Sequence, residues 1–86
     1  MNVGDNMALV KRLDLHGQTI DSARRLLTVT LRTLPKDVEE LVIIHGYHGG
    51  TAIADMVRSY RNSKIERKIL SMNNGETIFV IKQNRD

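Results

Sequence analysis

Hydrophobic positions along this chain follow two periodicities that alternate from one segment to the next. Short apolar runs bounded by polar and glycine residues predict strands over residues 9–15, 39–45, 65–72 and 77–82. Apolar residues at three- and four-residue spacing predict amphipathic helices over residues 20–34 and 52–62. The predicted order of elements is therefore β-α-β-α-β-β.

Local signals mark where these elements begin and end. Thr19 and Thr51 each precede a helical pattern and are placed to act as N-caps. Pro35 disfavours helical geometry at the preceding residue and ends the first helix. Asn74-Gly75 favours a tight two-residue hairpin between the last two strands. Residues 65, 67 and 69 of the third strand are expected on one side, and residues 68, 70 and 72 on the other.

Strands separated by helices imply right-handed parallel crossovers, and the final hairpin adds an antiparallel strand. We expect an α+β fold of two layers, with a four-stranded mixed sheet packed by two helices. The order of strands in the sheet does not follow from the pattern. The expected organisation is a flexible lead over residues 1–8, one domain over residues 9–82 and a polar tail over residues 83–86.

Composition narrows the class of protein. The 86 residues suffice for one small domain, and 41% hydrophobic and 27% charged residues are ordinary for a globular protein. The chain has no cysteine, which excludes disulfides and thiolate metal sites and fits a cytoplasmic location. No apolar run approaches the roughly 18 residues that a membrane span needs, so we expect no membrane partner.

The formal net charge of +3 is unevenly distributed. Five bases lie between residues 58 and 68 against the single acid Glu66: Arg58, Arg61, Lys64, Arg67 and Lys68. Such a cluster suits a polyanionic partner. A merely solvated basic surface is the alternative, and charge alone does not choose between them.

All three histidines follow predicted strands. His16 ends the run Leu13-Asp14-Leu15, and His45 and His48 flank the start of a glycine-rich loop after residues 41–44. If these two strands are parallel neighbours, their carboxyl ends meet at the edge where open α/β sheets bind ligands. Both loops lead into helix N-termini, which attract anions. We therefore expect the three imidazoles to converge on one phosphate-binding crevice.

Asp14 and His16 should share a side of the first strand, opposite Leu13 and Leu15. A carboxylate beside an imidazole fixes its tautomer and suits it to general acid or base catalysis. The alternatives are that Asp14 caps a neighbouring loop and that the histidines only tie loops together. A zinc site, or a weakly held Mg²⁺ or Mn²⁺, also remains open, although no metal ligand set is assigned.

The segments Leu13-Asp14-Leu15-His16-Gly17 and Ile43-Ile44-His45-Gly46, together with the predicted order of elements, resemble the small MutS-related (Smr) domain in a stand-alone bacterial form. The resemblance implies a fold like the C-terminal domain of translation initiation factor 3. It also implies nucleic-acid binding and, as in several members, nicking of DNA or cleavage of RNA. The second family motif, His-Gly-x-Gly, is altered here, because His48 stands at its last glycine.

The resulting prediction is a nucleic-acid-binding Smr-like domain with endonuclease activity on DNA or RNA. Aromatic residues are only 3% of the chain, so recognition should favour branched or structured nucleic acid over base sequence. The alternative is a non-catalytic module that binds nucleic acid or recruits a protein. DNA versus RNA, a metal requirement and the oligomeric state are left open. The candidate catalytic residues are Asp14, His16, His45 and His48. The candidate nucleic-acid contacts are Gly17, Gly46, Tyr47, Gly49, Gly50, Thr51, Arg58, Arg61, Lys64, Arg67 and Lys68.

Overall fold

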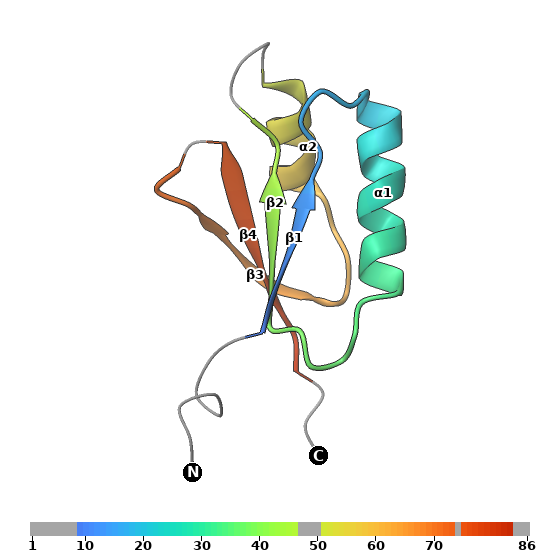
Figure 1. Cartoon of the computed structure of the whole chain (residues 1–86), viewed down its shortest axis with the longest axis vertical. Coiled ribbons are helices and arrows are strands. Elements are labelled where there is room, and N and C mark those ends of the chain that lie inside the picture. The colour runs from blue at the N-terminus through green and yellow to red at the C-terminus, as the bar shows by residue number, and fades with distance from the viewer. Residues whose placement is uncertain (1–8, 47–50, 74, 84–86) are drawn as a thin grey trace.

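A computed structural model describes residues 9–46, 51–73 and 75–83 of the chain. The elements follow the predicted order and the fold is the expected α+β class (Figure 1). They are β1 (Val10–Asp14), α1 (Ile20–Arg32), β2 (Glu40–Ile44), α2 (Ala52–Ser59), β3 (Ile65–Leu70) and β4 (Glu76–Ile81). Within the described ranges, no helix is long and apolar enough to cross a bilayer.

The four strands form one sheet in the order β1-β2-β4-β3, so β4 is inserted between β2 and β3. β1 and β2 are parallel, whereas β4 runs antiparallel to both of its neighbours. The register pairs Asp14 with Ile44, which are the last residues of β1 and β2. The expected mixed sheet is confirmed, and the carboxyl ends of the two parallel strands lie side by side as predicted.

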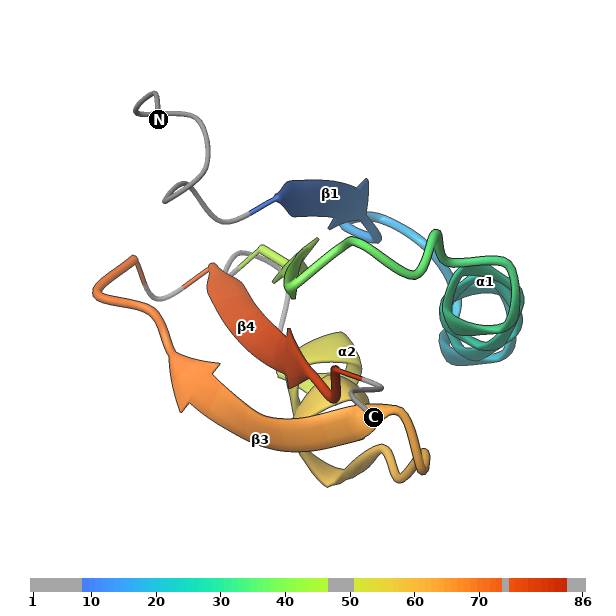
Figure 2. The same cartoon turned by 90° about the horizontal axis from the view of Figure 1, so that it is seen from below.

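Both helices cover the same face of the sheet (Figure 2). The core lies between this face and the two helices, and it is built from alternate strand positions and the apolar stripes of the helices. Leu13 and Leu15 pack on this core, as their alternation with Asp14 predicts. The fully buried large side chains include Leu15, Leu27, Leu31, Leu41, Ile43, Val57 and Phe79.

The two helices begin where predicted but end earlier. Thr19 caps α1, because its side-chain oxygen accepts a hydrogen bond from the backbone N–H of Ser22. Thr51 occupies the N-cap position of α2 but makes no such bond, and its hydroxyl donates instead to Asp55. The helix expected over residues 52–62 ends at Ser59, since Tyr60 is extended.

A β-bulge corrects the expected facing of β3. Ile65 pairs with Ile81 and packs on the core, but the register shifts before Arg67, which pairs with Val80. Inserting one residue moves the following side chains to the opposite face. Ile65 therefore does not share a side with Arg67 and Ile69, as simple alternation had predicted.

The hairpin predicted at Asn74-Gly75 is present, but its connection is longer than two residues. β3 ends at Leu70 and β4 begins at Glu76, which leaves residues 71–75 between them. Asn73 organises this connection: its side-chain oxygen accepts from the N–H of Gly75, and its carbonyl accepts from the N–H of Glu76. Asn74 itself lies outside the described residues.

Candidate nucleic-acid interface

The loops that follow β1 and β2 lie against each other at one end of the sheet. The N–H of Leu15 donates to the carbonyl of Ile44 at 2.7 Å, which extends the parallel pairing beyond both strands. One step further, a Cβ placed on Gly46 would stand 3.4 Å from the Cβ of His16. The first loop turns at Gly17, whose φ of +77° suits glycine. These contacts place His16 and Gly46 directly beside each other.

Asp14 and His16 form a hydrogen-bonded pair. Oδ1 of Asp14 lies 2.6 Å from Nδ1 of His16 and also accepts the backbone N–H of His16 at 3.0 Å. These two bonds, the ring contact first, lower the pKa of Asp14 below its usual value. Because a carboxylate only accepts, Nδ1 carries the proton and Nε2 is left as the outward nitrogen. The His16 side chain is 68% exposed, so this nitrogen is accessible to a ligand.

His45 is in the opposite situation, because it is only 5% exposed and both of its ring nitrogens have partners. Nδ1 lies 3.0 Å from the carbonyl of Gly46, and Nε2 lies 3.0 Å from the hydroxyl of the buried Thr77. The backbone N–H groups of His45 and Gly46 both donate to the carbonyl of Gly75. This histidine ties the β2 loop to the β4 end of the sheet.

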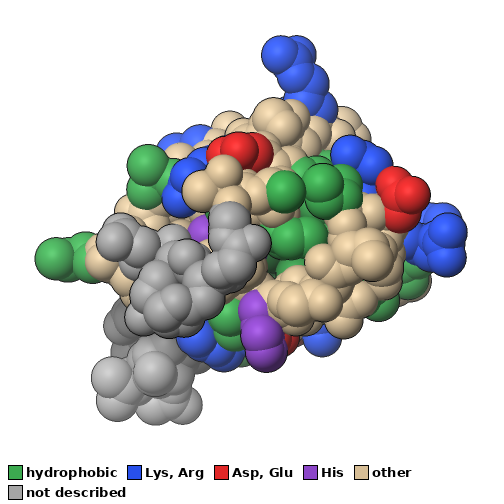
Figure 3. Space-filling model, turned by 90° about the horizontal axis from the view of Figure 1, so that it is seen from above, with side chains coloured by type: hydrophobic (Ala, Val, Ile, Leu, Met, Phe, Trp, Pro, Cys, Tyr) green, Lys and Arg blue, Asp and Glu red, His purple; other side chains and the backbone are tan. Residues whose placement is uncertain are grey.

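The structure thus brings together some of the predicted site residues. Asp14, His16, Gly17 and Gly46 meet at the surface, and His45 lies beneath them. Thr51 is exposed at the start of α2. Figure 3 views this end of the molecule and shows histidine atoms at the surface beside apolar side chains. Tyr47, His48, Gly49 and Gly50 lie outside the described residues.

The basic cluster divides into two kinds of side chain. The three arginines and Lys64 are exposed and Lys68 is half-buried, but only the two lysines donate to backbone carbonyls among the described residues. Arg67 also pairs with Glu66 at 3.7 Å. Lys68 donates to the carbonyls of Arg58 and Tyr60 and lies 5.5 Å from the centre of the Phe79 ring. Its burial, together with the charge of Arg61, lowers the pKa of Lys68.

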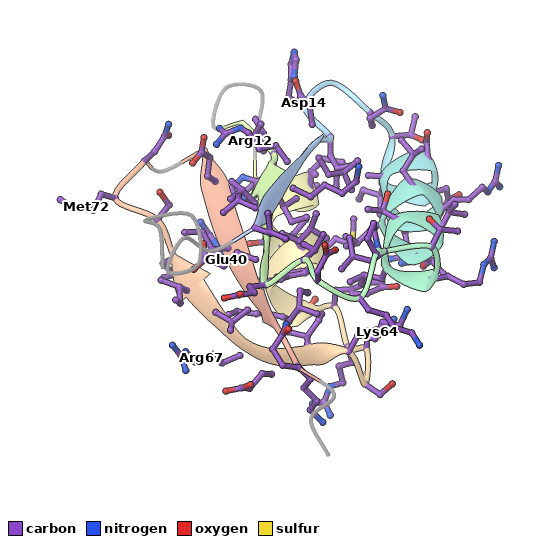
Figure 4. All side chains as sticks on the ribbon, turned by 60° about the horizontal axis from the view of Figure 1, so that its bottom comes forward. Arg12, Asp14, Glu40, Lys64, Arg67 and Met72 are labelled. Atoms are coloured by element: carbon purple, nitrogen blue, oxygen red, sulfur yellow. The ribbon has the colours of Figure 1, made fainter. Side chains whose placement is uncertain are left out.

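Lys64 has a similar internal contact at the far end of α1. Its Nζ donates to the carbonyl of Leu31 at 2.6 Å and to that of Arg32 at 3.3 Å, in the last turn where the regular helical hydrogen bonds end. Figure 4 places Lys64 beside the last turn of α1, away from Asp14, and Arg67 on β3. Of the five clustered bases, Lys64 and Lys68 therefore hold backbone carbonyls, whereas no described backbone carbonyl accepts from the three arginine side chains.

Two residues of this region were missed by the sequence reasoning. Arg12 lies two positions before Asp14 on the same open face of β1, and it forms an ion pair of 3.0 Å with Glu76 of β4. Strand alternation from Asp14 gives the signal that would have found Arg12. Thr77 had no such signal, because its contact with His45 spans 32 residues of sequence.

The described residues contain no group of three or more histidine, cysteine, aspartate or glutamate side chains placed to hold a metal ion. Asp14 and His16 meet only as a pair. Nothing in this geometry assigns a metal ligand set.

Comparisons with known proteins agree with this architecture. The family model of the Smr domain matches residues 13–77, from the start of the first histidine motif into β4. The chain belongs to the Smr domain family. That family consists of nuclease-like, nucleic-acid-binding domains.

A solved structure shows the same Smr domain fold. The crystal structure of the Smr domain of Thermus thermophilus MutS2 matches with a TM-score of 0.73 and 23% sequence identity, covering 84% of this chain and 98% of that one. A search among curated proteins found no match. The fold and the family inferred from the two histidine motifs are thereby confirmed.

Proposed function

We propose that this Smr domain binds nucleic acid at the loops after β1 and β2 and cleaves a phosphodiester bond there, with His16 as the general base. The observation that carries the proposal is the Asp14–His16 pair. Asp14 orients the His16 ring through Nδ1, and the exposed side chain leaves Nε2 accessible. Membership of the Smr family supports the nucleic-acid partner. A cytoplasmic location remains a prediction.

Asp14 fixes which nitrogen of His16 can act. With its Nδ1 proton directed at the carboxylate, His16 presents Nε2 to take a proton from the attacking hydroxyl, either water or a ribose 2′-OH. The oxygen of that hydroxyl forms a bond to phosphorus, and the bond to the leaving oxygen breaks as that oxygen takes up a proton. The neighbouring Asp14 charge stabilises the imidazolium that His16 becomes.

Other residues would hold the substrate. The β2 loop lies against His16 at Gly46, and a phosphate could lie against backbone N–H groups at the helix entries. Arg12 is paired with Glu76 but keeps an exposed side chain on the adjoining sheet face, and Arg58, Arg61 and Arg67 supply contacts to the nucleic-acid backbone. His45 serves mainly to hold the loop, and His48 is proposed to donate the proton to the leaving group.

A non-catalytic binding module is the second candidate. One observation favours it: both ring nitrogens of His45 are occupied, so His16 is the only exposed histidine among the described residues. Such a module would keep the phosphate contacts of the loops without completing the acid–base pair.

Cleavage and binding by the wild type and His16→Ala separate the two candidates. Both proteins are assayed on labelled single-stranded, duplex and branched DNA and RNA, with and without Mg²⁺ or Mn²⁺. Cleavage by the wild type that is lost in His16→Ala, with binding retained, supports the nuclease. Binding by the wild type without cleavage in every condition supports the module. If the wild type binds none of these nucleic acids, both candidates are contradicted.

A further inference from the structure

A second site lies at the opposite end of the molecule from the histidine loops. A cavity of about 510 Å³ opens where the end of α1, the start of β3 and the end of β4 come together. These segments lie at the far end of the sheet from Asp14 (Figure 1). A strand of five residues spans roughly 17 Å, so one small ligand could not touch both ends.

Four cations surround this cavity, and they come from three separate segments of the chain. They are Arg32, Lys36, Lys64 and Lys82. Among the described residues that line it there is no aspartate or glutamate, and none of the four cations takes part in an ion pair with a described residue. Like charges gathered without a counter-charge favour an anionic ligand.

The helix terminus does not account for this charge. Among the described side chains, Lys64 is the cation that donates to the carbonyls of Leu31 and Arg32 at the end of α1, and neither Lys36 nor Lys82 does so. An ammonium group has three donors, so Lys64 keeps one N–H for a ligand after serving both carbonyls.

The cavity also has an apolar part, formed by Leu34, Pro35 and Ile81. Leu34 and Ile81 are largely buried, so packing fixes their positions and only a small part of each faces the cavity. A cavity of this volume falls in the range that holds a small organic ligand and is larger than a phosphate ion requires. An apolar surface next to several cations matches a flat base attached to a phosphate.

We propose that this cavity binds a nucleotide, with its base against Leu34, Pro35 and Ile81 and its phosphate near Arg32, Lys36 and Lys82. The nucleotide is either free or the phosphorylated end of a strand, since both present the same chemistry. The site is separate from the histidine loops, so it does not depend on cleavage by His16.

The test uses the whole chain and amide NMR titrations with AMP, adenosine and inorganic phosphate. AMP should shift resonances of residues 34–36, 63–64 and 81–83 and bind more tightly than adenosine or phosphate alone. The variant Lys36→Glu/Lys82→Glu should lose affinity for AMP by roughly tenfold or more, because two charged contacts to phosphate become repulsive. The variant Lys11→Glu/Arg25→Glu is the control, because it makes the same change in net charge away from the cavity.

Two further measurements sharpen the result. Titrations with oligonucleotides that carry or lack a 5′-phosphate distinguish a strand end from a free nucleotide. Tighter binding of AMP than of adenosine, or of the phosphorylated than of the unphosphorylated oligonucleotide, at these residues supports the proposal. His16→Ala should bind AMP normally, which separates this site from the nuclease proposal. No shifts with millimolar AMP, shifts confined to residues 14–17 and 45–46, or equal losses in the two double variants would each overturn it.

Discussion

One carboxylate oxygen of Asp14 holds both the ring and the backbone N–H of His16. Because these bonds favour the ionised form, the pKa of Asp14 lies below its ordinary value. Their stabilising effect is complete above the unfolded-state pKa of Asp14 and is lost as the pH falls through the lower, folded-state value. The loss therefore belongs to acidic solution and leaves neutral pH unaffected.

We predict that NMR titration of the Asp14 carboxyl carbon gives a pKa below that of an unperturbed aspartate. His16→Ala should bring it back toward the ordinary value, because the ring contact is the largest cause of the shift. Asp14→Asn should reduce cleavage more than binding, since the ring loses its orientation. An unchanged titration in His16→Ala would contradict this assignment.

Gly46 and Gly17 form a matched pair for a second prediction. Both have positive φ, +75° and +77°, but only at Gly46 would a Cβ meet the Cβ of His16, at 3.4 Å. Alanine at either position costs about 1–2 kcal/mol of folding free energy through backbone strain. Gly46→Ala should also move the His16 ring resonances, whereas Gly17→Ala should not, as measured by NMR beside urea unfolding. Ring signals that stay unmoved in Gly46→Ala would show that the two loops do not constrain each other.

At the scale of the elements, the two helix N-termini differ although each has a threonine. Thr19 accepts a hydrogen bond from the N–H of Ser22, whereas Thr51 caps no backbone group with its side chain. We predict that Thr19→Ala lowers the free energy of unfolding by about 1 kcal/mol. Thr51→Ala should lower it by less than about 0.5 kcal/mol, as an exposed substitution does. Chemical denaturation measures both, and a larger loss at Thr51 would refute the difference in capping.

Local pattern was enough to predict the kind and order of the elements, because strand and helix periodicities are written in neighbouring residues. It missed the bulge after Ile65, since a bulge depends on how a strand pairs with its partner. It also placed Asp14 and His16 correctly on one side of β1, because two positions of alternation decide that. Local pattern could not predict the environment of His45, because its partners Thr77 and Gly75 are about 30 residues away in the sequence.

At the scale of the whole molecule, the exposed charges and the engaged charges should act differently on nucleic acid. Arg61 is exposed, whereas Lys68 donates to two backbone carbonyls and packs near Phe79. We predict that Arg61→Gln lowers the slope of log affinity against log salt concentration by about 1, which corresponds to one lost phosphate contact. Lys68→Gln should leave that dependence unchanged and should lower stability instead.

Binding measured over a series of salt concentrations, alongside thermal unfolding of each variant, checks this division. A reduced salt dependence in Lys68→Gln would mean that the lysine leaves its carbonyls to meet the nucleic acid. The strand order, which decides which charges share a surface, could not be predicted from the sequence because several orders satisfy the same local pattern.

The central position of β4 has a consequence for how the protein is made. When synthesis has reached only Leu70, β2 and β3 are present but β4, which pairs between them, is not yet made. Phe79 and Ile81 are then missing from the interior, and His45 has neither Thr77 nor Gly75 to hold it. The histidine loops therefore reach their folded arrangement only once β4 has paired, so a chain interrupted before β4 would lack part of its core and the contacts that hold His45.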